Sequence, residues 1–100
     1  MADWPLISDL GPLGALPTVP QLARGFVSVT LNCWGLDSLA DVTELLVSEL
    51  TTNVVRAAAD SDGRLRYDAE CKIPLLWIRL LCDNVRLLIE VWDTLPAVYG

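Results

Sequence analysis

A short break near the middle of the chain limits the fold more than any other feature of the sequence. Before the break, residues 38–59 carry apolar side chains at helical spacing, which predicts a long amphipathic helix that Asp37 or Ser38 caps. The break itself is the sequence DSDG at residues 60–63, which is typical of a turn. The expected buried stripe of this helix consists of Leu46, Leu50, Val54 and Ala57, widened by Val47 and Ala58.

Two further segments precede this helix. Residues 1–19 are rich in proline and glycine, which disfavour helix, so we expect an extended arm that contributes one edge strand. Apolar residues then recur at helical spacing over residues 20–33, which predicts a first helix. Thr18 and Gln21 form a capping-box pattern at its start, and Gly35 favours its end.

After the break, the pattern is that of β-strands. Strands are expected at residues 64–68, 75–82 and 85–93, with Asp83 and Asn84 as the turn between the last two. One face of the last strand carries Val85, Leu87, Ile89, Val91 and Asp93. Helices followed by an antiparallel hairpin predict an α+β fold, a two-layer sandwich in which two helices cover one face of an antiparallel or mixed sheet.

The composition excludes several classes of function. The 100 residues include no histidine, which excludes imidazole-dependent catalysis and zinc fingers. Seven Lys and Arg against thirteen Asp and Glu give a formal net charge of -6. Because binding to phosphate backbones needs a cationic face, we expect no nucleic-acid partner.

The cysteines and the apolar runs indicate in which cellular compartment the protein is expected. Cys33, Cys71 and Cys82 are scattered and odd in number, so we interpret them as small buried thiols in a reducing compartment and not as a disulfide framework. The N-terminus lacks the basic region of a signal peptide, and charged residues interrupt the long apolar runs. We therefore expect a cytoplasmic protein without a membrane segment.

Three polar residues lie on an expected apolar face or near its edge. Glu49 and Asn53 stand one turn apart on the long helix, and Asn53 falls about 20° from Leu46, at the edge of the apolar stripe. Asp93 lies on the apolar face of its strand, where a buried carboxylate needs a donor. One interpretation is a solvated helix flank and a strand-ending turn. The other is a cavity between the layers, with a carboxylate base, an amide metal ligand and an acceptor for a purine.

Three segments, in order, resemble a known family. The sequence ELLVSELTTNVVRAA (residues 44–58) is similar to the N-box helix of the bacterial ATP-binding proteins of the GHKL superfamily, with its Glu-x-x-x-Asn core. ARGFVSVTLNCWGL (residues 23–36) resembles their first helix, and VRLLIEVWD (residues 85–93) resembles the strand that delivers the adenine-binding Asp. The likeness covers residues 17–96 and is to the anti-sigma-factor serine kinase type, which implies a histidine-kinase-like ATPase fold.

The resemblance implies a role for each of the three polar residues. Asn53 matches the Asn that coordinates Mg²⁺ on the nucleotide phosphates, Glu49 the general base toward a serine hydroxyl, and Asp93 the acceptor for the adenine amine. It also implies ATP and Mg²⁺ as cofactors, and a sigma factor and an anti-anti-sigma protein as partners. Residues 20–100 would form a partial ATPase domain that ends before the ATP lid, with TLPA at residues 94–97 in place of the glycines that follow the Asp in the family.

A non-catalytic function is the alternative. Without the lid and the glycines, the same fold would serve as a protein-interaction or dimerisation module that turns over no nucleotide. An unpaired sheet edge would then invite pairing with a second copy of the chain. Trp34, Trp77 and Trp92 fit such an interface as well as they fit packing against the N-terminal arm. At this point both a kinase-like enzyme and a binding module stay open.

Overall fold

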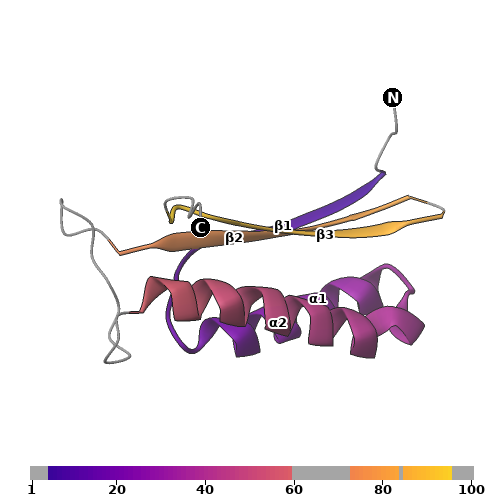
Figure 1. Cartoon of the computed structure of the whole chain (residues 1–100). Coiled ribbons are helices and arrows are strands. Elements are labelled where there is room, and N and C mark those ends of the chain that lie inside the picture. Colours follow the sequence, from indigo (N-terminus) through magenta and orange to yellow (C-terminus); the bar gives the residue numbers. More distant parts are fainter. Residues whose placement is uncertain (1–4, 60–72, 84, 96–100) are drawn as a thin grey trace.

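Two helices pack on one face of a three-stranded antiparallel sheet, as Figure 1 shows. The computed structural model describes residues 5–59, 73–83 and 85–95. The elements are β1 (Leu6–Gly14), α1 (Val19–Cys33), the short 3₁₀ helix η1 (Asp37–Leu39), α2 (Ala40–Ala58), β2 (Leu75–Cys82) and β3 (Leu87–Asp93). The predicted α+β sandwich is confirmed, and the expected strand at residues 64–68 lies outside the described residues.

The central strand β2 supplies the middle of the core. The sheet order is β1-β2-β3, so both neighbours of β2 run antiparallel to it and the N-terminal arm forms an edge strand, as expected. On its helix-facing side β2 buries Leu76, Ile78 and Leu80 completely. These side chains form one cluster with apolar residues of both helices, which holds the two layers together.

Helix α1 agrees with its predicted bounds to within one residue, but its predicted cap does not form. Thr18 has helical dihedral angles (φ -78°, ψ -13°), and its side chain makes no cap hydrogen bond. A capping side chain needs an extended backbone at this position, so the Thr18–Gln21 capping box was a wrong prediction. At the other end Gly35 adopts φ +71°, and the Leu36 amide donates to the Leu31 carbonyl at 2.8 Å, which ends the helix where expected.

Helix α2 begins later than predicted and buries a different stripe. The turn η1 precedes it, so neither Asp37 nor Ser38 caps it, and Leu39 takes that position. The buried stripe consists of Thr43, Val47, Thr51, Val54 and Ala58. Three residues predicted to be buried are exposed, namely Leu46, Leu50 and Ala57.

A hydrogen bond of its hydroxyl allows Thr51 to lie in this buried stripe, where the sequence pattern predicted leucines. Its Oγ1 donates to the Val47 carbonyl at 2.7 Å, so this hydroxyl is paired within the apolar layer. The stripe is therefore made of small side chains. Helix α2 also contacts β3, and its leucines, Leu45, Leu46 and Leu50, are exposed.

The β2–β3 hairpin matches the prediction for β2, whereas β3 begins two residues later than expected. The Asp83 amide donates to the Arg86 carbonyl at 3.0 Å, and Asp83 Oδ1 accepts from the amides of Val85 (2.7 Å) and Arg86 (2.6 Å). These backbone bonds, Val85 first, lower the pKa of Asp83 because they stabilise its ionised form. Residues 85 and 86, which the alternating pattern had placed in the strand, therefore belong to the turn.

Other expectations concern the cysteines and the membrane. Cys33 and Cys82 are free thiols, and Cys82 is buried as expected. The expectation of burial was wrong for Cys33, which is exposed at the end of α1, and Cys71 lies outside the described residues. No helix in residues 5–59, 73–83 and 85–95 has the length and hydropathy needed to cross a membrane.

Candidate functional site

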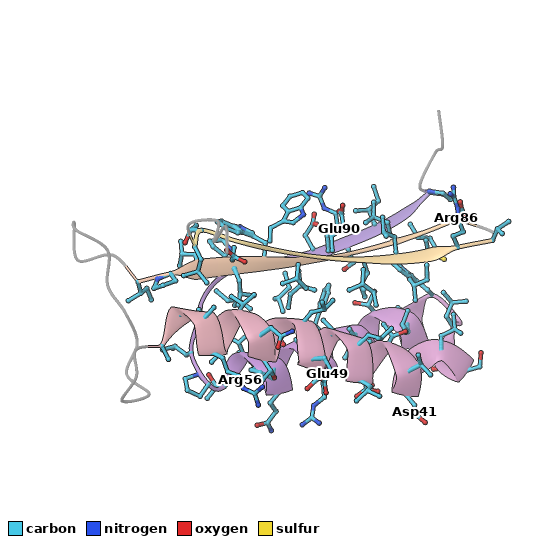
Figure 2. The ribbon with its side chains drawn as sticks, viewed as in Figure 1. Asp41, Glu49, Arg56, Arg86 and Glu90 are labelled. Carbon is cyan, nitrogen blue, oxygen red and sulfur yellow. The ribbon has the colours of Figure 1, made fainter. Side chains whose placement is uncertain are left out.

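The three residues predicted from the sequence are all exposed. Glu49 points away from the sheet on the outer side of α2, as Figure 2 shows. Asn53 lies about 120° from the centre of the buried stripe at about 100° per residue, on the same flank as Leu46 and Leu50. Asp93 ends β3, and its Oδ1 accepts from the Leu95 amide at 2.9 Å, which is the geometry of a strand-ending turn.

These residues do not enclose a cavity between the layers. Buried side chains of Val47, Thr51 and Val54 fill the space between α2 and the sheet. In the part of the chain that the structure describes, none of the three predicted residues lines the groove between α1 and β1 or the two smaller pockets beside Arg24 and beside Trp77. Asn53 and Asp93 belong to two elements in mutual contact, α2 and β3, whereas Glu49 is turned outward.

A magnesium ion at this place would have few protein ligands. Within the described residues, no three His, Cys, Asp or Glu side chains form a metal-binding group. The exposed amide of Asn53 could serve as a single ligand for an ion that arrives with nucleotide phosphates, a pattern that Mg²⁺ accepts. Among the described residues, this place therefore offers the amide oxygen of Asn53 and no metal site built by protein side chains alone.

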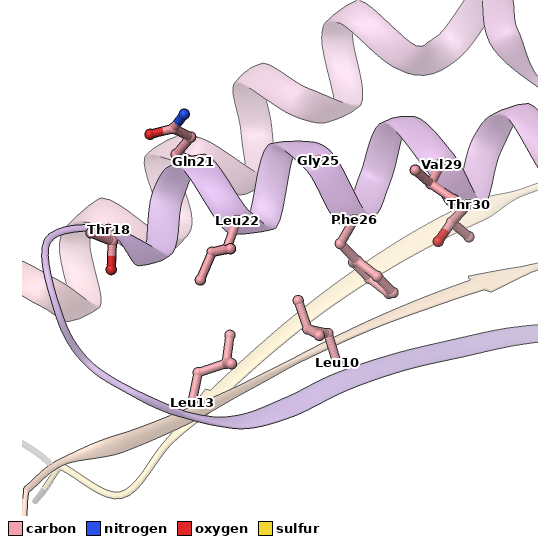
Figure 3. Close-up of a pocket in the computed structure, with 9 residues that line it drawn as sticks. All are labelled: Leu10, Leu13, Thr18, Gln21, Leu22, Gly25, Phe26, Val29 and Thr30. Carbon is pink, nitrogen blue, oxygen red and sulfur yellow. The ribbon is translucent and has the colours of Figure 1, made fainter.

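A different site is built between α1 and β1. A groove of about 1010 Å³ opens between this helix and the edge strand, and Figure 3 shows Leu22 facing Leu13 and Phe26 facing Leu10 across it. Its lining is Leu10, Leu13, Thr18, Gln21, Leu22, Gly25, Phe26, Val29 and Thr30. Its size lies at the upper end of the range of small-molecule sites.

The groove exists because α1 carries more apolar surface than the sheet covers. One stripe of this helix is fully buried against the core and contains Ala23, Val27 and Leu31. Leu22 and Val29 lie on the adjacent flank and are largely exposed. Gly25 adds no side chain there, and nothing lies within 4 Å of where its Cβ would be. In the described part of the chain, no strand pairs with the outer edge of β1 to cover this flank.

The surroundings of the groove carry little charge. None of its lining residues is ionisable, and α1 holds a single charged residue, Arg24. Acidic side chains gather instead on the second helix and its lead-in, where the structure describes Asp37, Asp41, Glu44 and Glu49. The groove is therefore the uncharged side of a strongly acidic domain.

The sequence contains one signal that points to the groove. Residues 19–33 present two apolar stripes, and a helix on a single sheet can bury only one of them. One stripe contains Val19, Ala23, Val27 and Leu31, and the other contains Leu22, Phe26 and Val29. Helical spacing alone shows that the helix exists but not which stripe faces the core. The position of the groove also needs the sheet order, which puts β1 at the edge.

Known proteins give no family assignment. No family model matches the chain, and no curated protein or solved structure matches it. The resemblance to ATP-binding proteins therefore rests on the sequence segments alone, and the groove rests on its geometry.

Proposed function

We propose that this domain is a protein-interaction module that associates with a second copy through α1 and the edge strand β1. The observation that carries the proposal is the uncharged apolar groove of about 1010 Å³ beside the open edge of the sheet. Exposed leucine and valine side chains gain free energy when a partner removes them from water. An apolar patch of this kind on a small domain is typical of an interaction site.

If two copies of the chain associate, their charges favour contact through this surface over contact through others. Two molecules that each carry a net charge of -6 repel one another at most orientations. The groove has no acidic residue among its lining, so packing along the groove brings no like charges together. Asp9 lies in the segment of β1 that would pair, and its carboxylate is already paired with Arg79 at 2.6 Å. Contacts through α2 would instead oppose the acidic residues around Asp41 and Glu44.

The edge of β1 supplies hydrogen-bonding groups for the same contact. An edge strand presents unpaired amides and carbonyls that can continue the sheet into another molecule. Pro12 has no amide to donate, and the register with β2 shifts between Leu10 and Leu13, so pairing would use residues 6–10. The interface would thus combine strand pairing at one end of β1 with packing of α1 along the groove.

Replacing Val29 with aspartate should disrupt the association. Val29 is 65% exposed, so the change removes little from the monomer's own core. In the dimer, an aspartate there would be buried without a partner, and we expect the dissociation constant to rise about tenfold or more. Sedimentation equilibrium at several concentrations measures this, with circular dichroism to show that the variant folds.

Val42→Asp is the matched control for this experiment. Val42 is also a helical valine and is 63% exposed, but it lies on α2. We expect the Val42→Asp protein to associate like the unmodified chain. An unmodified chain that stays monomeric at millimolar concentration, or equal effects of the two substitutions, would contradict the proposal.

A second candidate function is binding of Mg-ATP, with phosphoryl transfer to a serine of an anti-anti-sigma protein and a sigma factor as the regulated partner. It is favoured by the sequence resemblance and by the exposure of Asn53 and Asp93 on two elements in contact. Asn53 would hold the ion on the phosphates, and Glu49 would accept the serine proton. The ion, when bound, neutralises charge on the transferred phosphoryl group.

Asn53→Ala tests this second candidate. If Mg-ATP binds through the Asn53 amide, calorimetric titration should detect binding to the unmodified chain and at least about tenfold weaker binding to the variant. Asn32→Ala is the control, because Asn32 is an exposed asparagine on α1. No heat change at millimolar ATP, or equal weakening by both substitutions, would rule out this candidate and leave the interaction module untouched.

A further inference from the structure

The face of the sheet that the helices leave uncovered is organised in rows. Figure 1 shows both helices on the other side of the sheet. The strand registers set Asp9, Arg79 and Glu90 opposite one another across β1, β2 and β3. The next row pairs Trp77 with Trp92. Figure 2 shows Glu90 on this outer side, away from the helices. Charged and aromatic side chains thus lie in adjacent rows.

A small pocket sits where the two rows meet. It has a volume of about 160 Å³ and is lined by Asp9, Trp77, Arg79 and Trp92. The guanidinium of Arg79 is fixed at its wall, because Nε donates to Asp9 Oδ1 at 2.6 Å and Cζ lies 4.9 Å from the centroid of the Trp92 ring. The contact with the indole is a cation–π interaction. The pocket therefore has indole walls and polar groups in fixed positions.

The charge of this face is unbalanced toward the negative. Arg79 stands between Asp9 and Glu90, and both carboxylates raise its pKa, Asp9 most through its hydrogen bond. Two carboxylates against one guanidinium leave one negative charge in excess. Arg86, at the hairpin end of the sheet, forms an ion pair with Asp83 at 3.2 Å.

We propose that this outer face binds a basic segment of a partner protein and seats one lysine or arginine side chain in the pocket between Trp77 and Trp92. The aliphatic stem of such a side chain would pack on the indoles, and its cation would lie toward Glu90, the carboxylate in excess, which stands opposite Arg79 beside the pocket. The net charge of -6 would raise the association rate of basic partners over long distance. An anion would have to approach Arg79 between two carboxylates, which disfavours it.

Two peptides and one substitution test this assignment. An arginine–glycine hexapeptide is titrated into the full chain, and the indole NH resonances of Trp77 and Trp92 are followed by nuclear magnetic resonance. We expect both resonances to move with the basic peptide and not with a glutamate–glycine hexapeptide. Glu90→Gln removes the excess negative charge of the row and should weaken binding about fivefold.

Asp41→Asn separates a specific site from diffuse attraction. It changes the net charge by the same amount, but Asp41 lies on α2 and points away from the sheet, as Figure 2 shows. We expect the Asp41→Asn protein to bind the basic peptide with unchanged affinity. Equal weakening by both substitutions, a basic peptide that moves neither indole resonance, or preferential binding of the acidic peptide would each overturn the proposal.

Discussion

Leu80→Ala is expected to lower the free energy of unfolding by about 2–5 kcal/mol. Leu80 is fully buried in the central strand, and it pairs with Ser8 on one side and Ile89 on the other. Removing its side chain leaves a cavity in the layer between the sheet and both helices, which the surrounding backbone cannot close. Urea denaturation followed by circular dichroism, at one protein concentration for all variants, measures the loss.

Leu88→Ala is the matched control for the core substitution. Leu88 lies on the neighbouring strand β3 but faces outward and is 41% exposed. Its removal creates no enclosed cavity, so we expect a loss of about 1 kcal/mol or less. If Leu88→Ala destabilised the protein as much as Leu80→Ala, the assignment of the inner and outer faces of the sheet would be wrong.

Gly11→Ala is expected to be the most damaging change in the edge strand. Gly11 has φ +134°, a conformation that side chains with a Cβ rarely adopt. A Cβ added there would lie 2.9 Å from Trp77 Cδ1 and 3.0 Å from the Leu76 carbonyl oxygen. The carbonyl belongs to the backbone of the central strand, so moving it would disturb the pairing of the sheet. We expect the free energy of unfolding to fall by about 1–3 kcal/mol in urea denaturation.

Gly25→Ala should have the opposite effect. Gly25 lies inside α1, and nothing is found within 4 Å of its would-be Cβ. In a helix interior, alanine is more favourable than glycine by roughly 0.5–1 kcal/mol. The free energy of unfolding of the variant should therefore rise by up to about that amount. A Gly11→Ala protein as stable as the Gly25→Ala protein would show that β1 does not approach β2 as closely as described.

The sequence predicts the helices and the β2–β3 hairpin well, because each carries a strong period, whereas the edge strand β1 was expected only from the proline and glycine content of residues 1–19. The run of apolar residues at 75–82 lies between a proline and a turn, and it forms β2 with the predicted bounds. The stripe that α2 buries could not be predicted from its leucines. Burial of Thr51 depends on a hydrogen bond to Val47, and hydropathy gives no sign of that bond.

The candidate surfaces depend on contacts between distant parts of the chain, which local patterns do not encode. The groove brings Leu13 to Leu22 across a strand–helix connection, and it opens only because β1 is at the edge of the sheet. The outer-face pocket joins Asp9 to Arg79, 70 residues apart. Glu49, Asn53 and Asp93 were selected by spacing and resemblance, and their proposed roles stay predictions.

Concentration-dependent nuclear magnetic resonance tests the proposed interface most directly. Amide spectra of the unmodified chain are recorded over a dilution series and compared residue by residue. We predict that the resonances which move belong to residues 6–10 of β1 and 22–29 of α1, while those of residues 41–50 on α2 stay in place. Spectra that do not change with concentration, or changes centred on α2, would contradict self-association through the α1–β1 groove.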